Sequence, residues 1–181
     1  MRVIVIGDGP GGLSAALFLA KNGQEVTVYG QDKTAMHWAL LKNYLGVPEI
    51  KGSEFQSIAR KQAESFGARL LEARVESVRK IPSGFEVTLE NGETATADFL
   101  ILSEGKSPRL AQQLGLSFDE QSGLSVDING KTALAGVYAV GRLARPTRSQ
   151  AIISAGDGAA AAIDILSTLA QKPVQDWDEP G

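Results

Sequence analysis

The spacing of apolar and polar positions in the first thirty residues predicts a strand, a helix and a second strand. Residues 2–6, RVIVI, form a short β-branched run that is typical of a strand buried on both faces. Between residues 12 and 22, small and apolar side chains recur at helical spacing, and Gly23 provides a stop signal. Residues 25–29, EVTVY, form the second strand. Because so short a connection has room for one helix, we expect the two strands to be parallel.

The pattern in the rest of the chain predicts a second helix, a β-meander and a return to the parallel sheet. Residues 53–66 carry apolar side chains at helical spacing behind Ser53, a residue type that often caps a helix. Segments 68–81, 84–90 and 94–105 are typical of strands separated by PSG and NG turns, and residues 99–103 lead back into the sheet. A strand over 136–140 and a long helix from about 154 to 171 follow.

These elements predict an α/β fold: a single Rossmann-like domain with a central parallel sheet, flanking helices and a small β-meander. A chain of 181 residues, 43% of them hydrophobic, is long enough to bury the core of one domain. We expect that domain to span residues 1–181. One half, 1–105, holds the βαβ unit and the meander, and the other, 106–181, closes the binding site.

Composition excludes several kinds of chemistry. The chain has no cysteine, which rules out disulfides, thiolate metal sites, a CxxC redox pair and a cysteine nucleophile within it. A single histidine, His37, argues against a multi-histidine site, so no metal is expected. The net charge of -3, with no long basic run, argues against nucleic acid as a partner. With no stretch expected to reach the roughly 18 to 20 apolar residues of a membrane span, we expect a cytoplasmic protein.

A phosphate-binding motif lies where the first predicted strand meets the first predicted helix. Gly7, Gly9 and Gly12 form G-x-G-x-x-G in the strand–turn–helix context that the motif requires. Gly7 permits the tight turn, Gly9 lets a pyrophosphate approach the backbone, and Gly12 permits close packing of helix on strand. Free N–H groups at the helix start suit the phosphate charge. The alternative is a glycine-rich turn that binds nothing.

The acid that usually follows such a motif is missing. Tyr29 and Gly30 stand at the end of the second strand, where a ribose-binding carboxylate is expected. The nearest carboxylate, Asp32, lies two places late, 20 residues beyond Gly12. Asp32 either contacts the ribose or is an ordinary solvated loop charge.

Several stretches, taken in order, resemble the FAD domain of low-molecular-weight thioredoxin reductases, which are pyridine nucleotide-disulfide oxidoreductases. They are the opening, residues 43–70, residues 107–110 and residues 136–162. In that family an NADPH-binding domain is inserted after an ATGxxPR-like segment. Here LSEGKSPR, residues 102–109, runs directly into residues 110–130, which resemble the segment after the insertion. The resemblance covers nearly the whole chain and implies a related protein reduced to its FAD-binding domain, with the NADPH domain absent.

The resemblance implies where the cofactor binds. Asn43 matches a position near the flavin, and Val75 matches a residue whose backbone meets adenine. Gln150 and Ala151 match residues that present backbone groups to the flavin at the start of the last helix. Including the positions where this chain departs from the family, the candidate cofactor-binding residues are Gly7, Gly9, Pro10, Gly11, Gly12, Tyr29, Gly30, Asp32, Asn43, Val75, Ser103, Glu104, Gly105, Gly141, Arg142, Gln150 and Ala151. No catalytic acid or base is predicted.

Two further departures from the family lie in this set. Arg142 follows Gly141 where the family has an aspartate that accepts a hydrogen bond from the ribityl chain, and a guanidinium group cannot accept one. Arg142 either pairs with the pyrophosphate or points to solvent. Ser103, Glu104 and Gly105 replace the family's ATG. Glu104 is either exposed at the surface or close enough to the cofactor to disfavour added negative charge.

These features lead to a functional hypothesis with two alternatives. The first is an oxidoreductase that passes electrons through non-covalent FAD without a redox-active cysteine pair. NAD(P)H would be a transient reductant, or a small molecule or protein would donate or accept the electrons. The alternatives are a non-catalytic FAD-binding module, such as a redox sensor or a subunit of an electron-transfer complex, and a nicotinamide-binding domain without flavin. The small residues at the start of the last helix argue against a nicotinamide domain, and the family resemblance implies a homodimer.

Overall fold

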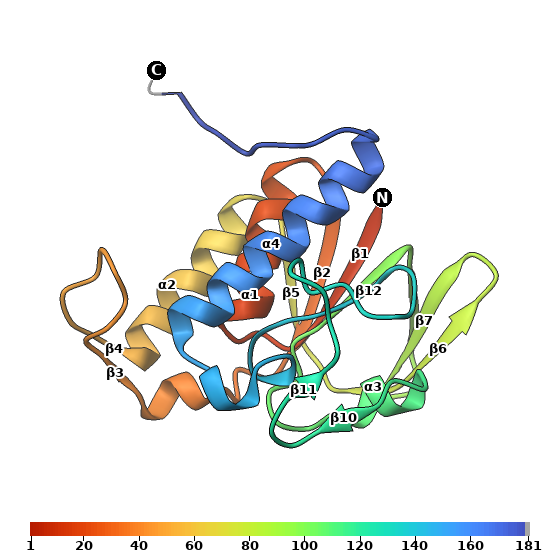
Figure 1. Ribbon diagram of the computed structural model, residues 1–181, viewed down its shortest axis with the longest axis horizontal. Coiled ribbons are helices and arrows are strands. Elements are labelled where there is room, and N and C mark those ends of the chain that lie inside the picture. Colours follow the sequence, from red (N-terminus) through yellow and green to blue (C-terminus); the bar gives the residue numbers. More distant parts are fainter. Residues whose placement is uncertain (180–181) are drawn as a thin grey trace.

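The computed structural model describes residues 1–179 and is built around a sheet of five parallel strands. In the order in which they pair, they are β12 (Val137–Ala139), β9 (Phe99–Leu102), β1 (Arg2–Ile6), β2 (Glu25–Gly30) and β5 (Arg69–Glu72). Ile4 of β1 pairs with Thr27 on one side and with Leu100 on the other. The chain therefore winds from β1 outward to β2 and β5, then crosses to β9 and β12 on the other side of β1 (Figure 1).

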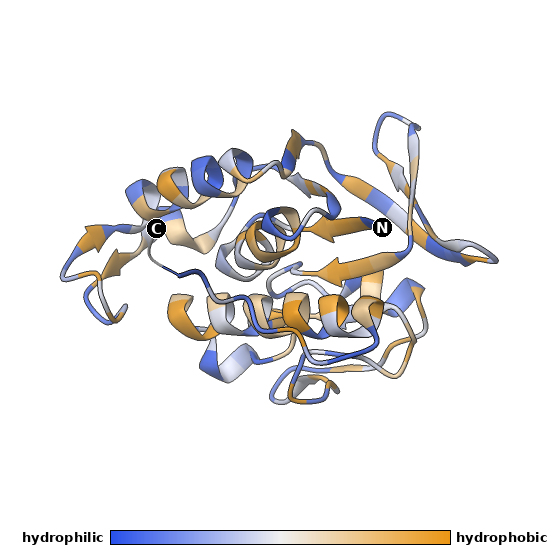
Figure 2. Cartoon of the chain, turned by 90° about the horizontal axis from the view of Figure 1, so that it is seen from above, coloured by the Kyte–Doolittle hydropathy of each residue, from blue (hydrophilic) through white to orange (hydrophobic). Residues whose placement is uncertain are grey.

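Helices cover one face of this sheet (Figure 1). They are α1 (Pro10–Lys21), α2 (Gly52–Ser65) and α4 (Ala151–Ala170). Val3 and Val5 of β1 belong to the same buried cluster as Ile165 of α4, whereas Ile4 and Ile6 belong to a second cluster on the opposite face. Because both faces are covered, the strands are apolar along most of their length, as the colouring in Figure 2 shows.

The opposite face is covered by an antiparallel β-meander and the short helix α3 (Arg109–Gln113). The meander consists of β6 (Val75–Ile81), β7 (Gly84–Leu89) and β8 (Thr94–Ala97), and lies to the right of the sheet in Figure 1. The β7–β8 hairpin that the NG signal predicted is confirmed, and Gly92 has φ +85°, but the connection spans residues 90–93 and is longer than the two residues that this signal indicates. Phe85 and Val87 of β7 are buried in one cluster with Leu100, which ties the meander to the sheet.

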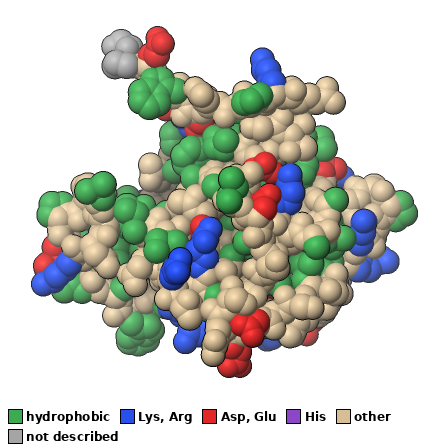
Figure 3. All heavy atoms as spheres, in the orientation of Figure 1, with side chains coloured by type: hydrophobic (Ala, Val, Ile, Leu, Met, Phe, Trp, Pro, Cys, Tyr) green, Lys and Arg blue, Asp and Glu red, His purple; other side chains and the backbone are tan. Residues whose placement is uncertain are grey.

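Short elements occupy the remaining connections. They are η1 (Ala35–Trp38), β3 (Leu40–Leu41), β4 (Ile50–Lys51), β10 (Phe118–Asp119), β11 (Gly123–Leu124), η2 (Gly141–Leu143) and η3 (Pro146–Arg148). The segment from η1 to β4 exposes large apolar side chains, since Trp38 is 92% exposed and Leu45 is 88% exposed. Figure 3 shows hydrophobic side chains gathered over this end of the molecule, on the left.

The predicted fold class, a Rossmann-like α/β domain with a central parallel sheet and a small β-meander, is confirmed, but one helix start is corrected. Ser53 is not the cap of α2, because the helix begins at Gly52 and Lys51 takes the cap position. The backbone of Gly52 explains this start. Its N–H donates to the Ala39 carbonyl oxygen at 2.8 Å, and a side chain there would overlap the carbonyl oxygen of Met36.

The strand predicted over residues 68–81 is two strands with different partners. β5 pairs in parallel with β2 and extends the central sheet, with Arg69 opposite Thr27. β6 pairs antiparallel with β7 and begins the meander. Parallel and antiparallel strands share the same period of two residues, so the apolar pattern does not separate them.

The helix α4 begins at Ala151, earlier than the expected start near residue 154. Within residues 1–179 it is the one helix whose length and composition would allow it to cross a membrane. The expectation that no stretch reaches this limit was therefore wrong. A core helix of a globular domain passes the same test, and Ala161, Ile165 and Leu166 of α4 are buried in the cluster that covers the sheet.

Candidate functional site

A cavity of about 610 Å³ opens at the carboxyl ends of the parallel strands. It lies between Gly7, after β1, and Ser103, after β9, where the chain winds away from the centre of the sheet in opposite directions. Ligands of open α/β sheets bind at such a switch point, and this volume is in the usual range for a small-molecule site. Most candidate residues line it: Gly7, Gly9, Pro10, Gly11, Tyr29, Gly30, Val75, Ser103, Glu104, Gly105, Gly141, Arg142 and Ala151.

The glycine-rich loop has the geometry that a pyrophosphate requires. Gly7 has φ +103°, and a Cβ there would overlap the carbonyl oxygen of Ser103, while a Cβ on Gly12 would overlap that of Gly7. The nearest atom to a Cβ on Gly9 is Thr34 Oγ1 at 3.6 Å, an ordinary contact, so the backbone is open to the cavity. No side chain within residues 1–179 caps the start of α1, whose N–H groups therefore suit an anionic ligand.

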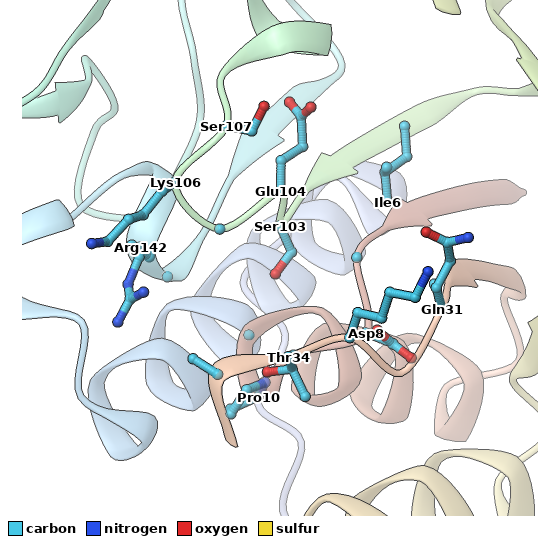
Figure 4. A pocket seen from close by; sticks show the side chains of 18 of the residues that line it. Ile6, Asp8, Pro10, Gln31, Thr34, Ser103, Glu104, Lys106, Ser107 and Arg142 are labelled. Carbon is cyan, nitrogen blue, oxygen red and sulfur yellow. The ribbon is translucent and has the colours of Figure 1, made fainter. Parts of the chain in front are cut away.

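Basic side chains outnumber acidic ones in the cavity wall. None of the five takes part in the ion pairs found within residues 1–179; they are Lys33, Arg74, Lys106, Arg109 and Arg142. In Figure 4, Lys106 and Arg142 lie toward one end of the cavity and Asp8 toward the other, with Ser103 between them. This excess of positive charge suits a ligand that carries phosphate groups.

Arg142 lines the cavity and does not simply extend into solvent. Its Nε donates to Ser149 Oγ at 3.0 Å, which tethers the guanidinium group across the loop after β12. The neighbouring Arg145 donates to Asp157 Oδ1 at 2.8 Å, and the same carboxylate accepts the Gly141 N–H at 3.3 Å. Asp157 therefore orders this loop, and the contact of Arg142 with a pyrophosphate stays a prediction.

Glu104 is not an exposed surface residue, so that expectation was wrong. It is partly buried, and its carboxylate accepts the N–H groups of Leu110 at 3.0 Å and Ala111 at 3.2 Å in the first turn of α3. Burial raises the pKa of Glu104 above its ordinary value, and the two hydrogen bonds oppose that rise. Figure 4 shows the carboxylate pointing away from Pro10 and Thr34 on the other wall. An effect of Glu104 on a reduced cofactor stays a prediction.

Four candidate residues are not part of the cavity wall: Gly12, Asp32, Asn43 and Gln150. Gly12 supports the loop from behind. Asn43 Nδ2 donates to Gln150 Oε1 at 3.0 Å, across 107 positions of sequence. Gln150 occupies the position before the first turn of α4 without capping it by a side-chain hydrogen bond, and Ala151 directly after it lines the cavity, so the Asn43–Gln150 pair lies beside the site. Its contact with a cofactor stays a prediction.

Asp32 is turned toward His37. Its Oδ1 lies 3.1 Å from His37 Nε2, and its carbonyl oxygen lies 2.7 Å from the same nitrogen. The backbone of Asp32 has φ +51°, and its N–H donates to Asp8 Oδ2 at 3.0 Å. A contact between the Asp32 side chain and a ribose stays a prediction. The geometry does not favour it, because the side chain is turned toward His37.

One buried polar residue of the glycine loop was not predicted from the sequence. Asp8 is 5% exposed, lines the cavity and accepts a hydrogen bond from the Arg60 guanidinium of α2. One turn earlier on α2, the fully buried Gln56 donates from Nε2 to the Asp8 carbonyl oxygen at 2.5 Å. The sequence did hold a signal, because a carboxylate inside a phosphate-binding loop needs a cationic partner.

The small residues at the start of α4 serve a helix–helix contact as well as the cavity. A Cβ on Gly158 would overlap the carbonyl oxygen of Gly11 in α1, and a Cβ on Gly11 would lie 3.1 Å from the Ser154 carbonyl oxygen. Ala151 and Ser154 of α4 also line the cavity. Close packing of α1 on α4 thus explains part of this pattern. Because this contact already requires small residues, their presence at the start of α4 is weaker support against a nicotinamide-binding domain.

Together, the sheet order, the cavity and the glycine-rich loop define a Rossmann-like α/β protein with a ligand site at its switch point. The chain belongs to the pyridine nucleotide-disulphide oxidoreductase family, whose model matches residues 1–51 and 46–158. This confirms the family resemblance seen in the sequence.

Named relatives agree with this assignment. Thioredoxin reductase 2, mitochondrial, of Saccharomyces cerevisiae is 28% identical in an alignment of 186 positions, gaps included. The alignment covers 94% of this chain and 51% of that protein. The nitric oxide reductase FlRd-NAD(+) reductase of Aeromonas salmonicida is 30% identical over 146 residues, which cover 80% of this chain and 35% of that protein. The chain thus spans about half the length, or less, of these curated relatives.

Solved structures show the same fold. A thioredoxin reductase from Gloeobacter violaceus aligns with a TM-score of 0.87 and 18% identity, over 98% of each chain. The atypical thioredoxin reductase TRi from Desulfovibrio vulgaris Hildenborough aligns with a TM-score of 0.83 and 19% identity, over 94% of this chain and 98% of that one.

Proposed function

We propose that this chain is an FAD-binding flavoprotein that acts as an oxidoreductase through a non-covalent flavin. The observation that carries the proposal is the cavity at the switch point, where the backbone at Gly9 is open and basic side chains surround the space. The names of its relatives, thioredoxin reductases and a FlRd-NAD(+) reductase, support the same class of chemistry.

The residues present fit an extended dinucleotide. The start of α1 and the open backbone at Gly9 would hold the pyrophosphate, and Val75 at the cavity wall would meet the adenine. At the other end, Ala151 lies at the start of α4, where no side chain within residues 1–179 caps the helix. Free N–H groups and the positive end of that helix would stabilise negative charge that a flavin gathers on reduction.

Bound FAD would supply the redox chemistry, and the chain would bind it, orient it and adjust its potential. The 181 residues contain no cysteine, so this chain holds no dithiol of its own to exchange electrons with the flavin. Electrons would come from NAD(P)H as a transient reductant, or from a small molecule or protein that also defines the acceptor. We assign no catalytic acid or base.

The alternative is a non-catalytic FAD-binding module, a redox sensor or a subunit of a larger electron-transfer complex. Arg142 favours it, because this cavity residue stands where the family has a hydrogen-bond acceptor. Glu104, the other charged departure from the family, does not favour the module in the same way, since its carboxylate accepts hydrogen bonds from the start of α3.

Anaerobic titration of the purified protein distinguishes these functions. We expect a yellow protein, or one that turns yellow with added FAD, whose flavin absorption is bleached by NADH, NADPH or a reduced partner protein. A yellow protein that none of these reductants bleaches would support the non-catalytic module. A colourless protein that does not take up FAD would refute both.

Arg142→Ala tests the cavity end opposite Asp8. We expect weaker FAD binding, because the change removes a cation from the cavity wall that would pair with the pyrophosphate. Arg148→Ala is the matched control, since it makes the same change at an exposed residue of the same loop that does not line the cavity. Fluorescence titration with FAD measures both, and equal affinities would remove Arg142 from the site.

A further inference from the structure

The end of β2 lacks an acid because another carboxylate already fills the space beside it. A Cβ on Gly30 would overlap Cγ of Asp8 and would lie only 2.6 Å from its Oδ1. The Asp8 side chain, which comes from the glycine loop, therefore occupies the position that a side chain at the end of β2 would take. Gly30 and Asp8 form a matched pair, in which one residue has no side chain and the other supplies the carboxylate.

The Asp8 carboxylate is held in place from two sides. Arg60 of α2 donates to Oδ2, and so does the Asp32 N–H, at 3.0 Å. Gln56, on the same face of α2, fixes the Asp8 backbone through the carbonyl oxygen. Since both donors meet Oδ2 and Asp8 lines the cavity, Oδ1 is the oxygen left for a ligand.

The position of Asp8 along the cavity matches the sugar of an adenosine. Gly30, Gln31 and Val75 line the same part of the wall, and Figure 4 shows Asp8 and Gln31 on the side away from Lys106 and Arg142. In dinucleotide-binding folds an acid at the end of the second strand hydrogen-bonds the ribose in this place. We propose that Asp8, positioned by Arg60, is the ribose-binding acid of this site. This inference rests on the proposed binding of FAD.

An Asp8 carboxylate at the ribose would also affect which ligand the site binds. An ionised carboxylate is an acceptor only, so it favours a ribose whose hydroxyl groups are free to donate. It would also repel a phosphate on the 2′ oxygen. The site would therefore select an adenosine diphosphate moiety with free ribose hydroxyls, which FAD carries.

Competition with FAD tests the proposal through the ribose hydroxyls themselves. ADP and 2′,3′-dideoxy-ADP are used to displace FAD from the wild type and from Asp8→Asn, and FAD fluorescence reports the displacement. For the wild type we expect ADP to bind roughly tenfold more tightly than the dideoxy compound, as a hydrogen bond to a charged group would give. Asp8→Asn is expected to lose most of that preference.

Three further variants keep the test independent of folding. Asp176→Asn is the matched control, because Asp176 is also an acid paired with a cation, Lys21, in a partly buried position, and it lies outside this cavity. It should keep the full preference for ADP. Asp8→Gly combined with Gly30→Glu returns the acid to the end of β2 and should restore the preference, whereas Gly30→Glu alone should unfold more easily because it overlaps Asp8.

Each outcome decides the inference. A wild type that binds FAD but does not distinguish ADP from the dideoxy compound overturns the role of Asp8 and leaves the proposed function intact. The same holds if Asp8→Asn weakens both compounds by the same factor, since Asp8 would then only shape the loop. A protein that does not bind FAD overturns the proposed function, and this inference with it.

Discussion

At the scale of single residues, charged groups beside the cavity are stabilised by fixed partners. Asp8 is paired with Arg60, Glu104 with the first turn of α3, and Asp157 with Arg145. Removing one member of such a pair leaves the other desolvated and unpaired, which costs about 1 to 3 kcal/mol or more. These residues are therefore coupled to their partners, and their substitution acts on the loop that each partner holds.

The pH dependence of stability tests Glu104. Because its pKa is raised in the folded protein, the folded state binds a proton more readily than the unfolded chain, so this group's contribution to stability falls as pH rises through that pKa. The free energy of unfolding of the wild type, minus that of Glu104→Gln, should therefore increase as pH is lowered from about 7 toward the ordinary value of 4.5. Urea unfolding at both pH values measures it.

Glutamine keeps one acceptor oxygen for the two α3 N–H groups. The hydrogen bond that it loses adds an offset that does not depend on pH, so the pH dependence of the difference reports the Glu104 proton. Other carboxylates titrate in both proteins and cancel in the difference. A difference that stays constant or becomes smaller at low pH would show that Glu104 is not buried as described.

At the scale of elements, the crossing of α1 and α4 positions both ends of the site. The glycine loop leads into α1, and the first turn of α4 supplies Ala151 and Ser154 to the cavity wall. The two helices approach most closely where Gly158 meets the backbone of Gly11. A change in their separation would therefore alter the width of the cavity.

A pair of glycine substitutions in α4 tests this crossing. Gly158→Ala places a methyl group on the Gly11 carbonyl oxygen and should destabilise the protein by about 1 to 3 kcal/mol, with weaker FAD binding. Gly156→Ala is the control in the same helix: with open space around its Cβ, it should stabilise by about 0.5 to 1 kcal/mol. Urea unfolding compares them, and a stabilised Gly158→Ala would contradict the close contact.

At the scale of the whole molecule, the exposed apolar side chains of the η1–β4 segment are the surface that we expect a second copy to cover. The homodimer follows from the family resemblance, and it stays a prediction, as does a cytoplasmic location. Trp38 is 92% exposed and Leu45 is 88% exposed, so these two residues give the proposed dimer interface a location that can be tested. Exposed apolar patches of this kind often mark protein interfaces.

Light scattering tests the homodimer. We expect a dimer for the wild type and a shift toward monomer for Leu45→Glu and Trp38→Glu, which place charge in the proposed interface. Ile128→Glu is the control, because Ile128 is equally exposed, at 87%, in a different loop. A monomeric wild type, or an equal shift with Ile128→Glu, would refute this interface.

Some elements of this fold were predictable from the sequence, and others were not. The βαβ unit and the hairpin at Asn91–Gly92 were predictable because their signals are local: a buried apolar run, helical spacing and an NG pair between two apolar segments. The division between β5 and β6 was not, because strand pairing depends on residues far apart in sequence. The early start of α2 depends in the same way on a distant contact between Gly52 and Met36.

For the site, the sequence by itself determined the glycine-rich loop and the family, and it predicted the kind of ligand, since spacing and motifs are local features of the chain. It also showed that an acid was missing at Gly30. Only the tertiary structure decided where a carboxylate lies instead. Asp8 and Gly30 are 22 positions apart and Asp8 and Arg60 are 52, and they meet because β2 and α2 fold against the loop. Burial and charge pairing are properties of that packing, which no local pattern contains.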